Sequence, residues 1–153
     1  MMSEVIIREA RPEDAERLLE IYAYYVENTA ISFEYDVPVL SEFQERIKNT
    51  LKHYPYLVVE REGRVQGYAY AGALGERAAY GRSCELSVYL DRSARRCGLG
   101  RQLYRALEDR LKEMGILNMY ACCFNMVLTL PQLTEEAFLP SIISFLISKL
   151  FSL

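Results

Sequence analysis

The feature that most constrains the fold is a strand, an arginine-rich loop with two glycines, and a long helix in direct succession. Cys84–Leu90 alternates apolar and polar residues, which predicts a strand with one buried face. Leucines at heptad-like spacing predict a helix from about Gly98 to Met114, with Gly115 as its C-terminal stop. The loop between them brings together Arg92, Arg95, Arg96, Gly98, Gly100 and Arg101.

This loop has the composition of an anion-binding site. The first turn of a helix has free backbone N–H groups and a partial positive charge, and glycines let a ligand approach the backbone closely. Four arginines within ten residues of a chain with net charge −3 favour a polyphosphate over a monoanion. The sequence lacks a Walker motif, and Leu103 occupies the third glycine position of a dinucleotide-binding loop. The remaining pattern is Arg-x-x-Gly-x-Gly between a strand and a helix.

The other segments predict one domain of the α/β (α+β) class. Pro12 favours the start of a first helix, whose apolar stripe runs from Ala15 to Val26. Ser41 and Gln44 form a capping box for a second helix, which ends before Pro55. Strands are expected at Val5–Arg8, Tyr56–Glu60, Val65–Gly72, Cys84–Leu90 and Leu117–Phe124. This order predicts a mixed, mostly antiparallel sheet flanked by helices.

Composition disfavours several other classes of protein. His53 is the only histidine, and we interpret it as a solvated residue at a helix end, so neither a metal site nor a histidine-based hydrolase is expected. The four cysteines form no CxxC pair, and reduced thiols in the cytoplasm are the better interpretation. The N-terminus lacks a signal-peptide pattern. The acidic balance gives no reason to expect nucleic acid as a partner.

Residues Arg95–Gly100 resemble the coenzyme A loop of GNAT acetyltransferases, whose pattern is [RQ]-x-x-G-x-[GA]. The resemblance extends over about residues 4–122 and is strongest to the phosphinothricin (methionine sulfoximine) N-acetyltransferase branch. It is carried by further segments, namely Ile7–Ala10, Ser32-Phe33, Tyr54–Val58, Gly67–Gly72 and Glu85–Leu90. The resemblance implies a GNAT-like fold and acetyl-CoA as the acetyl donor.

The resemblance also implies roles for single residues. Glu85 corresponds to a catalytic glutamate that takes a proton from the acceptor amine and is the best candidate for that role; the alternative is a surface glutamate on the polar side of a strand. Backbone N–H groups in this stretch would polarise the acetyl carbonyl. The expected acetyl-CoA contacts are Ser87, Val88, Tyr89, Arg95, Arg96, Cys97, Gly98, Leu99 and Gly100.

The acceptor is expected to be a small amino-acid-like amine of the phosphinothricin or methionine sulfoximine type. Arg77 would pair with its carboxylate, and Phe33 and Tyr80 would enclose its side chain. Each of these three residues could instead be loop surface or core. The alternatives are another amine, such as a polyamine or a protein N-terminus, and a GNAT-like protein that binds CoA but is catalytically impaired.

The last part of the chain differs from the rest. Of 39 charged residues (18 + 21), only Glu135, Glu136 and Lys149 follow residue 114. Residues 1–153 are therefore interpreted as a single GNAT-like domain with a divergent tail from about residue 124. No closing strands are expected after about Phe124. An apolar helix begun by Pro140 would be too short to cross a membrane. Such a helix would need cover, which favours a homodimer.

Overall fold

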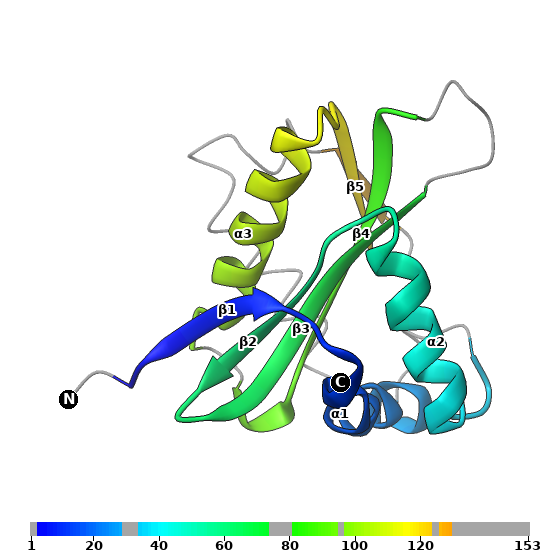
Figure 1. Ribbon diagram of the computed structural model, residues 1–153, viewed down its shortest axis with the longest axis vertical. Coiled ribbons are helices and arrows are strands. Elements are labelled where there is room, and N and C mark those ends of the chain that lie inside the picture. The colour runs from blue at the N-terminus through cyan, green and yellow to red at the C-terminus, as the bar shows by residue number, and fades with distance from the viewer. Residues whose placement is uncertain (1–2, 29–33, 74–80, 95–96, 124–125, 130–153) are drawn as a thin grey trace.

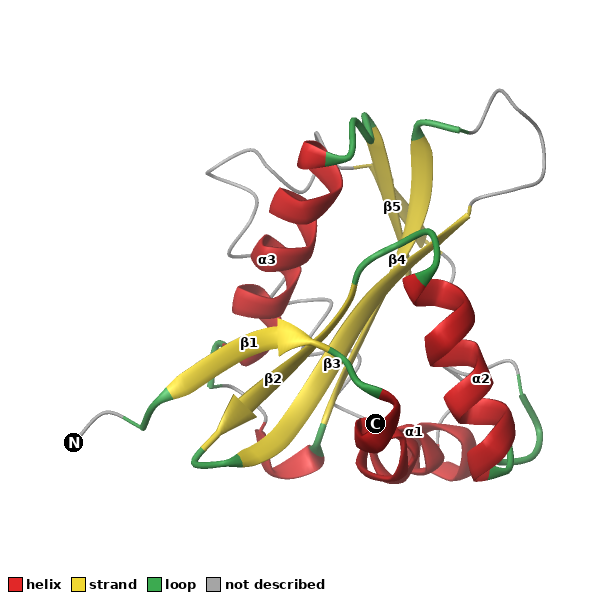
Figure 2. Ribbon diagram, viewed as in Figure 1, coloured by secondary structure: helices red, strands yellow, loops and turns green. Residues whose placement is uncertain are grey.

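The computed structural model describes residues 3–28, 34–73, 81–94, 97–123 and 126–129. Six strands form one sheet in the order β1-β2-β3-β4-β5-β6 (Figures 1 and 2). They are β1 (Val5–Glu9), β2 (Tyr56–Arg61), β3 (Arg64–Ala73), β4 (Ser83–Leu90), β5 (Asn118–Cys123) and β6 (Met126–Thr129). β4 and β5 are parallel, and the other neighbours are antiparallel. The predicted mixed, mostly antiparallel sheet is confirmed.

Helices of the described part of the chain cover both faces of the sheet (Figures 1 and 2). Helices α1 (Ala15–Asn28) and α2 (Leu40–Leu51) lie on one face, and α3 (Leu99–Glu113) lies on the other. The predicted leucine stripe of α3 is buried against the sheet, because each of its members falls on one side of the helix. Its members are Leu99, Leu103, Leu107 and Leu111. Two short 3-10 turns, η1 (Pro12–Asp14) and η3 (Arg92–Ala94), precede α1 and α3.

The start of α2 differs from the sequence prediction. The helix begins at Leu40 and has Val39 as its N-cap, with no side-chain capping hydrogen bond, so the capping box at Ser41 and Gln44 is wrong. Val39 has extended backbone angles, and its carbonyl accepts the first helical hydrogen bond from the Phe43 amide at 3.0 Å. The extended backbone of Val39 after Pro38 sets this helix start, and the hydroxyl of Ser41, two residues later, does not.

A strand follows Phe124 at Met126–Thr129, whereas the prediction that the usual last two closing strands do not form extends into residues 130–153, which lie outside the described residues. The segment Met126–Thr129 is β6, and it pairs antiparallel with β5 from Cys123↔Met126 to Tyr120↔Thr129. The pairing supplies partners to backbone groups on the edge of β5, which would otherwise remain unpaired. Residues 130–153, including the apolar segment after Pro140, lie outside the described residues.

Two buried tyrosines, one on α1 and one on α3, differ in whether their hydroxyl groups have a hydrogen-bond partner. Tyr25 and Tyr104 are both buried. The Tyr25 hydroxyl donates a hydrogen bond of 2.6 Å to the Leu90 carbonyl at the end of β4. The Tyr104 hydroxyl has no hydrogen-bond partner within the part of the chain that the structure describes.

The same substitution is therefore expected to have different effects at these two positions. Tyr25→Phe should lower the free energy of unfolding by about 1–2 kcal/mol, because it leaves the Leu90 carbonyl short of a donor. Tyr104→Phe should leave stability unchanged or raise it, because it removes a buried polar group without a partner. Urea denaturation of the two variants measures both effects. Equal losses would contradict the hydrogen-bond assignment.

Candidate active site

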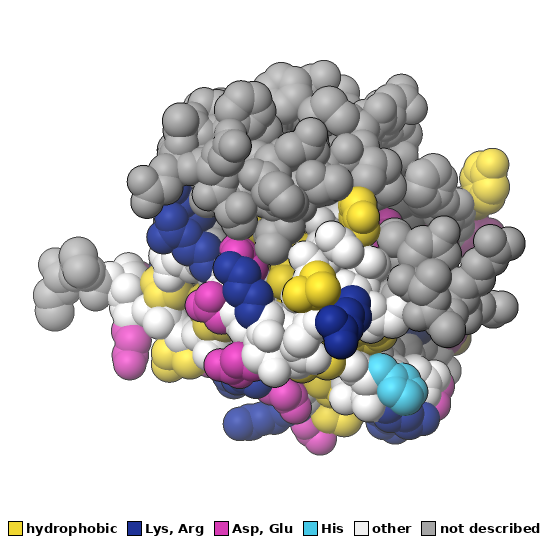
Figure 3. Space-filling view, turned by 90° about the horizontal axis from the view of Figure 1, so that it is seen from above, with side chains coloured by type: hydrophobic (Ala, Val, Ile, Leu, Met, Phe, Trp, Pro, Cys, Tyr) yellow, Lys and Arg dark blue, Asp and Glu magenta, His cyan; other side chains and the backbone are white. Residues whose placement is uncertain are grey.

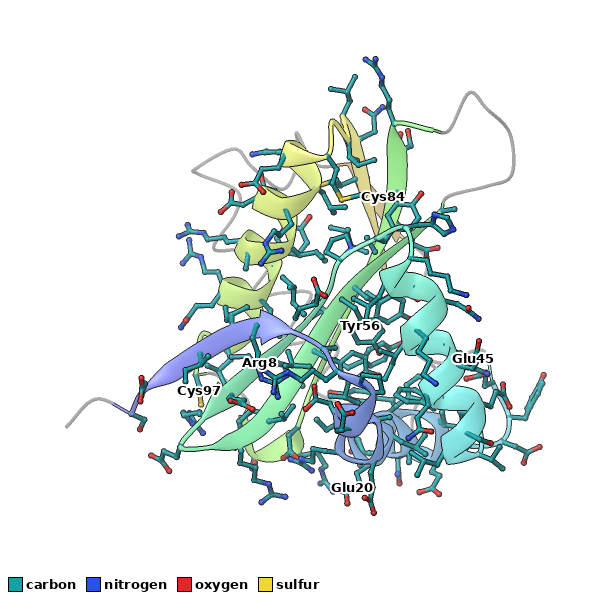
Figure 4. All side chains as sticks on the ribbon, viewed as in Figure 1. Arg8, Glu20, Glu45, Tyr56, Cys84 and Cys97 are labelled. Carbon is teal, nitrogen blue, oxygen red and sulfur yellow. The ribbon has the colours of Figure 1, made fainter. Side chains whose placement is uncertain are left out.

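Strand β4 presents its polar side chains to α1 and α2. The Tyr89 ring lies 5.4 Å from the Tyr22 ring and 5.3 Å from the Tyr25 ring, so this face of β4 packs against α1. Side chains alternate along a strand, and Glu85 and Ser87 therefore share the face of Tyr89. Cys84 lies on the opposite face, toward α3 (Figure 4). The predicted alternation of β4 is confirmed.

Glu85 is half-buried, and its cross-strand partner on β3 is Gly72. The next pair along the same face is Ser87 with Tyr70, whose hydroxyl is hydrogen-bonded to the Ser87 side chain. Burial raises the pKa of Tyr70, and the nearby charge of Glu85 acts in the same direction, while the bond to Ser87 opposes them. Tyr70 is therefore a neutral phenol that can donate a hydrogen bond beside Glu85.

In the described part of the chain, the edge of β4 is left without a strand partner after Leu86, one residue beyond Glu85. β4 pairs with β5 from Ser83↔Asn118 to Leu86↔Ala121, whereas its pairing with β3 continues to Leu90. Among the described residues, Ser87–Leu90 thus has no strand partner on the β5 side. A strand edge of this kind can pair with an extended ligand through backbone hydrogen bonds.

The turn that follows β4 is held by a carboxylate. Asp91 forms an ion pair with Arg17 of α1, with 2.6 Å between Oδ2 and the guanidinium. Its other oxygen, Oδ1, accepts hydrogen bonds from the amide and the hydroxyl of Ser93 at 2.8 and 2.7 Å. Burial acts to raise the pKa of Asp91, but the hydrogen bonds from Ser93 and Arg17 outweigh burial, so the pKa lies below its ordinary value. The Asp91 amide also donates to the Gln66 carbonyl at 2.7 Å. These contacts fix the direction in which the chain leaves the sheet toward α3.

Helix α3 begins at a glycine in the left-handed conformation. Gly98 is the N-cap, with φ 75°, and no side chain caps the helix. The first helical hydrogen bond runs from the Gln102 amide to the Gly98 carbonyl at 3.2 Å, so the amides of Leu99, Gly100 and Arg101 precede it. Among the described residues, a Cβ placed on Gly98 would meet nothing within 4 Å, so these residues leave space at the helix start. This arrangement fits a phosphate group.

The four arginines of the loop have different surroundings. The Arg92 guanidinium lies 4.4 Å above the Tyr24 ring of α1, so Arg92 packs on that ring and is not committed to a helix-start ligand. Arg95 and Arg96 lie outside the described residues. Arg101 is the third residue of α3, and its buried Nε has no hydrogen-bond partner in the described part of the chain. An anionic ligand at this helix start would be a suitable partner for it.

The predicted site residues therefore divide into two groups. Phe33, Arg77, Tyr80, Arg95 and Arg96 lie outside the described residues. The others lie along one path from β4 to the start of α3, namely Glu85, Ser87, Val88, Tyr89, Cys97, Gly98, Leu99 and Gly100.

Not all of these residues can contact a ligand through their side chains. Val88 lies on the α3 side of β4, Leu99 is buried, and the Tyr89 ring is packed among aromatic rings. Only their backbone groups could take part. Cys97 is exposed (Figure 4).

Sequence reasoning missed Tyr70 and Gly72. The segment Gly67–Gly72 contained a signal for both residues, because small residues alternate with Tyr68 and Tyr70. Such alternation indicates a strand with small residues on one face and aromatic residues on the other. The Tyr56, Tyr68, Tyr70 and Tyr89 rings indeed stack on the face toward α1 and α2, with centroid separations of 4.9 to 6.3 Å.

An ion-pair network from α2 lies near this aromatic face. The Arg46 guanidinium bonds to Glu34 and Glu42, with one Arg46–Glu34 contact at 3.0 Å, and the Tyr22 hydroxyl also donates to Glu34. The hydrogen bonds from Arg46 lower the pKa of Glu34, burial opposes them, and the Tyr22 bond adds to the lowering. The charges of Arg46 and Glu34 both influence the ionisation of Tyr70. The network therefore borders the region that contains Tyr70 and Glu85.

Other candidate features are weaker. The only histidine of the chain, His53, is exposed near the end of α2, as predicted (Figure 3, cyan). Within the described ranges there is no cluster of three or more histidine, cysteine or acidic residues that could hold a metal ion. No helix in the same ranges has the length and apolar character needed to cross a membrane.

Comparison with known proteins assigns the class of this fold. Residues 7–137 match the family model of the acetyltransferase (GNAT) domain. A solved N-acetyltransferase from Staphylococcus aureus superposes with a TM-score of 0.79 at 28% identity, over 94% of this chain and 82% of that chain. A solved GNAT phosphinothricin acetyltransferase from Sinorhizobium meliloti, in complex with acetyl-CoA, gives 0.74 at 35% identity, over 79% and 65% of the two chains.

These matches define an acetyltransferase fold. The chain belongs to the GNAT acetyltransferase domain family. A phosphinothricin N-acetyltransferase from Streptomyces viridochromogenes is 32% identical over 117 residues, which are 76% of this chain. The chain spans 64% of the length of that relative. The family match continues to residue 137, past the point near residue 123 where the sequence resemblance ended.

Proposed function

We propose that this chain is an acetyl-CoA-dependent N-acetyltransferase that acts on the amino group of a small amino-acid-like substrate, of the phosphinothricin or methionine sulfoximine type. The observation that carries the proposal is the position of Glu85. It lies on β4 one residue before the last pair with β5, and the chain continues from β4 through the arginine-rich loop to helix α3, which begins after Gly98. Family membership and the printed activities of the relatives support the same conclusion.

The start of α3 and the edge of β4 would hold the donor. The amides of Leu99 and Gly100, aided by Arg95, Arg96 and Arg101, would bind the pyrophosphate. Backbone groups of Ser87–Tyr89 would align the pantetheine arm and polarise the acetyl carbonyl. Bound acetyl-CoA supplies an activated acetyl thioester. The described residues fit this ligand, because they combine an open strand edge, an open helix start and an unpartnered buried guanidinium nitrogen.

Glu85 would prepare the acceptor. An amine attacks a thioester only as the free base, yet most α-amino groups are protonated near neutral pH. The Glu85 carboxylate, half-buried and on the face toward α1 and α2, would take this proton directly or through one water. Arg77 is proposed to pair with the acceptor carboxylate, and Phe33 and Tyr80 to enclose its side chain.

The acceptor class is tested with matched pairs of amines. Phosphinothricin and methionine sulfoximine should have kcat/KM values at least about 10-fold above those of their decarboxylated analogues, because only the amino acids offer a carboxylate to Arg77. The acetylated product is measured by mass spectrometry. A reagent that detects the thiol of released CoA would also react with the exposed Cys97.

Spermidine tests the rival acceptor class in the same assay. Equal values for amino acids and decarboxylated amines would overturn the acceptor assignment. Acetyl-CoA binding without any acetylated product would support an impaired, CoA-binding protein.

A further inference from the structure

The position across from Glu85 is occupied by a residue without a side chain. Gly72 of β3 is the direct cross-strand partner of Glu85. Partners in an antiparallel pair project to the same face, with Cβ atoms about 5 Å apart. Any side chain at position 72 would therefore stand beside the Glu85 carboxylate, on the face toward α1 and α2.

Neither backbone conformation nor packing requires glycine at this position. Gly72 lies within strand β3 and, unlike Gly63, Gly98 and Gly115, does not have a positive φ. A Cβ added to it would meet no atom of the described residues within 4 Å. Gly67 on the same strand differs, because its Cβ would lie 2.4 Å from Leu90 Cδ2 and 2.7 Å from the Tyr89 carbonyl oxygen. Glycine inside a strand weakens the strand, so Gly72 lowers stability without a structural reason that is visible in the fold.

Polar and aromatic side chains surround the space over Gly72. Glu85 lies on one side of it, and Tyr70, the next residue of β3 on the same face, lies on another. Tyr70 is held by its hydrogen bond to Ser87, and the Glu34–Arg46 ion pair contributes charge near the Tyr70 ring. Among these described groups the charges are two carboxylates and one guanidinium, which favours a cationic amine. The Tyr70 ring offers an apolar surface for the substituent next to that amine.

We propose that Gly72 determines acceptor specificity, by keeping open the position beside Glu85 that receives the acceptor amine and its α-carbon. The ligand class is a small primary amine with a substituent on the adjacent carbon. This inference rests on the proposed acetyltransferase function and adds a residue that selects among acceptors by size.

Two substitutions test this inference. A Cβ at position 72 meets no described atom within 4 Å, so Gly72→Ala should keep the melting temperature of the parent chain or exceed it, and Gly72→Val, a β-branched residue in a strand, should also remain folded. The acceptor KM should rise moderately for Gly72→Ala and by at least about 10-fold for Gly72→Val, because a single methylene in a pocket can change discrimination by that factor. The acetyl-CoA dissociation constant should stay within about 2-fold of the parent value.

Ala73→Val is the matched control. Ala73 is exposed, lies on the same strand and projects to the opposite face. This variant creates the same β-branched side chain on the other face and should leave both affinities within about 2-fold of the parent.

A second readout does not depend on turnover. Calorimetric titration of the chain without acetyl-CoA, using phosphinothricin as the probe, should show weaker binding for Gly72→Val and unchanged binding for Ala73→Val. Gly72 variants with parental acceptor KM and affinity would overturn the inference while leaving the proposed function intact. A parent chain that acetylates no amine and binds no phosphinothricin would overturn both.

Discussion

Replacing Glu85 by glutamine is expected to lower turnover by about 100-fold or more near neutral pH. The amide has nearly the same shape as the carboxylate but cannot accept the proton of the acceptor ammonium, and general bases contribute about 10²–10⁴-fold. Acetyl-CoA affinity should not change, because Glu85 is proposed to act on the acceptor. Initial rates and calorimetry on the purified variant measure the two effects.

The pH profile separates loss of a base from structural damage. The residual rate of Glu85→Gln should rise with pH as the fraction of free amine increases, since the solution then removes the proton that Glu85 no longer takes. Glu45→Gln is the control, because Glu45 is exposed on α2 (Figure 4) and should keep the full rate. A Glu85→Gln chain with a near-parental rate would return Glu85 to the role of a surface residue.

Replacing Gly98 by valine is expected to weaken acetyl-CoA binding by at least about 10-fold, from a parental dissociation constant in the micromolar range, or about −8 kcal/mol. Gly98 has φ 75°, where a residue with a Cβ is strained by about 1–2 kcal/mol. Relief of that strain would reorient the first amides of α3. A retained side chain would stand in the open space where the pyrophosphate is proposed to approach.

The C-terminal end of the same helix provides a matched control. Gly115 has φ 80°, and a Cβ there also meets no described residue within 4 Å. Gly115→Val should therefore lower stability by an amount similar to Gly98→Val but leave acetyl-CoA affinity unchanged. Calorimetry and thermal denaturation on both variants compare the two positions. Equal affinities in folded Gly98→Val and Gly115→Val chains would exclude the Gly98 helix start from the acetyl-CoA site.

The sequence by itself determined the local structure of this domain. Leucine spacing in Leu99–Leu111, alternation in β4 and the glycines around the long helix are local signals. Each depends on residues within one or two turns or a few strand positions, and the elements form at nearly the predicted places. The start of α2 was misplaced because Val39 adopts the cap conformation without a capping side chain. Strand β6 was missed because its pairing with β5 lies outside its own four residues.

Only the tertiary structure decided how these elements make a site. The register of β3 against β4 places Gly72 beside Glu85 and Tyr70 beside Ser87. The pairing of β4 with β5 ends after Leu86, which leaves the following edge of β4 without a strand partner among the described residues. The guanidinium of Arg92 packs on the Tyr24 ring of α1, separately from the helix start. Strand register and ring contacts join residues that are far apart in the chain, and the free energy that selects them comes from packing of the whole sheet against its helices. Local periodicity specifies which face a residue occupies, but it does not specify the residue across from it.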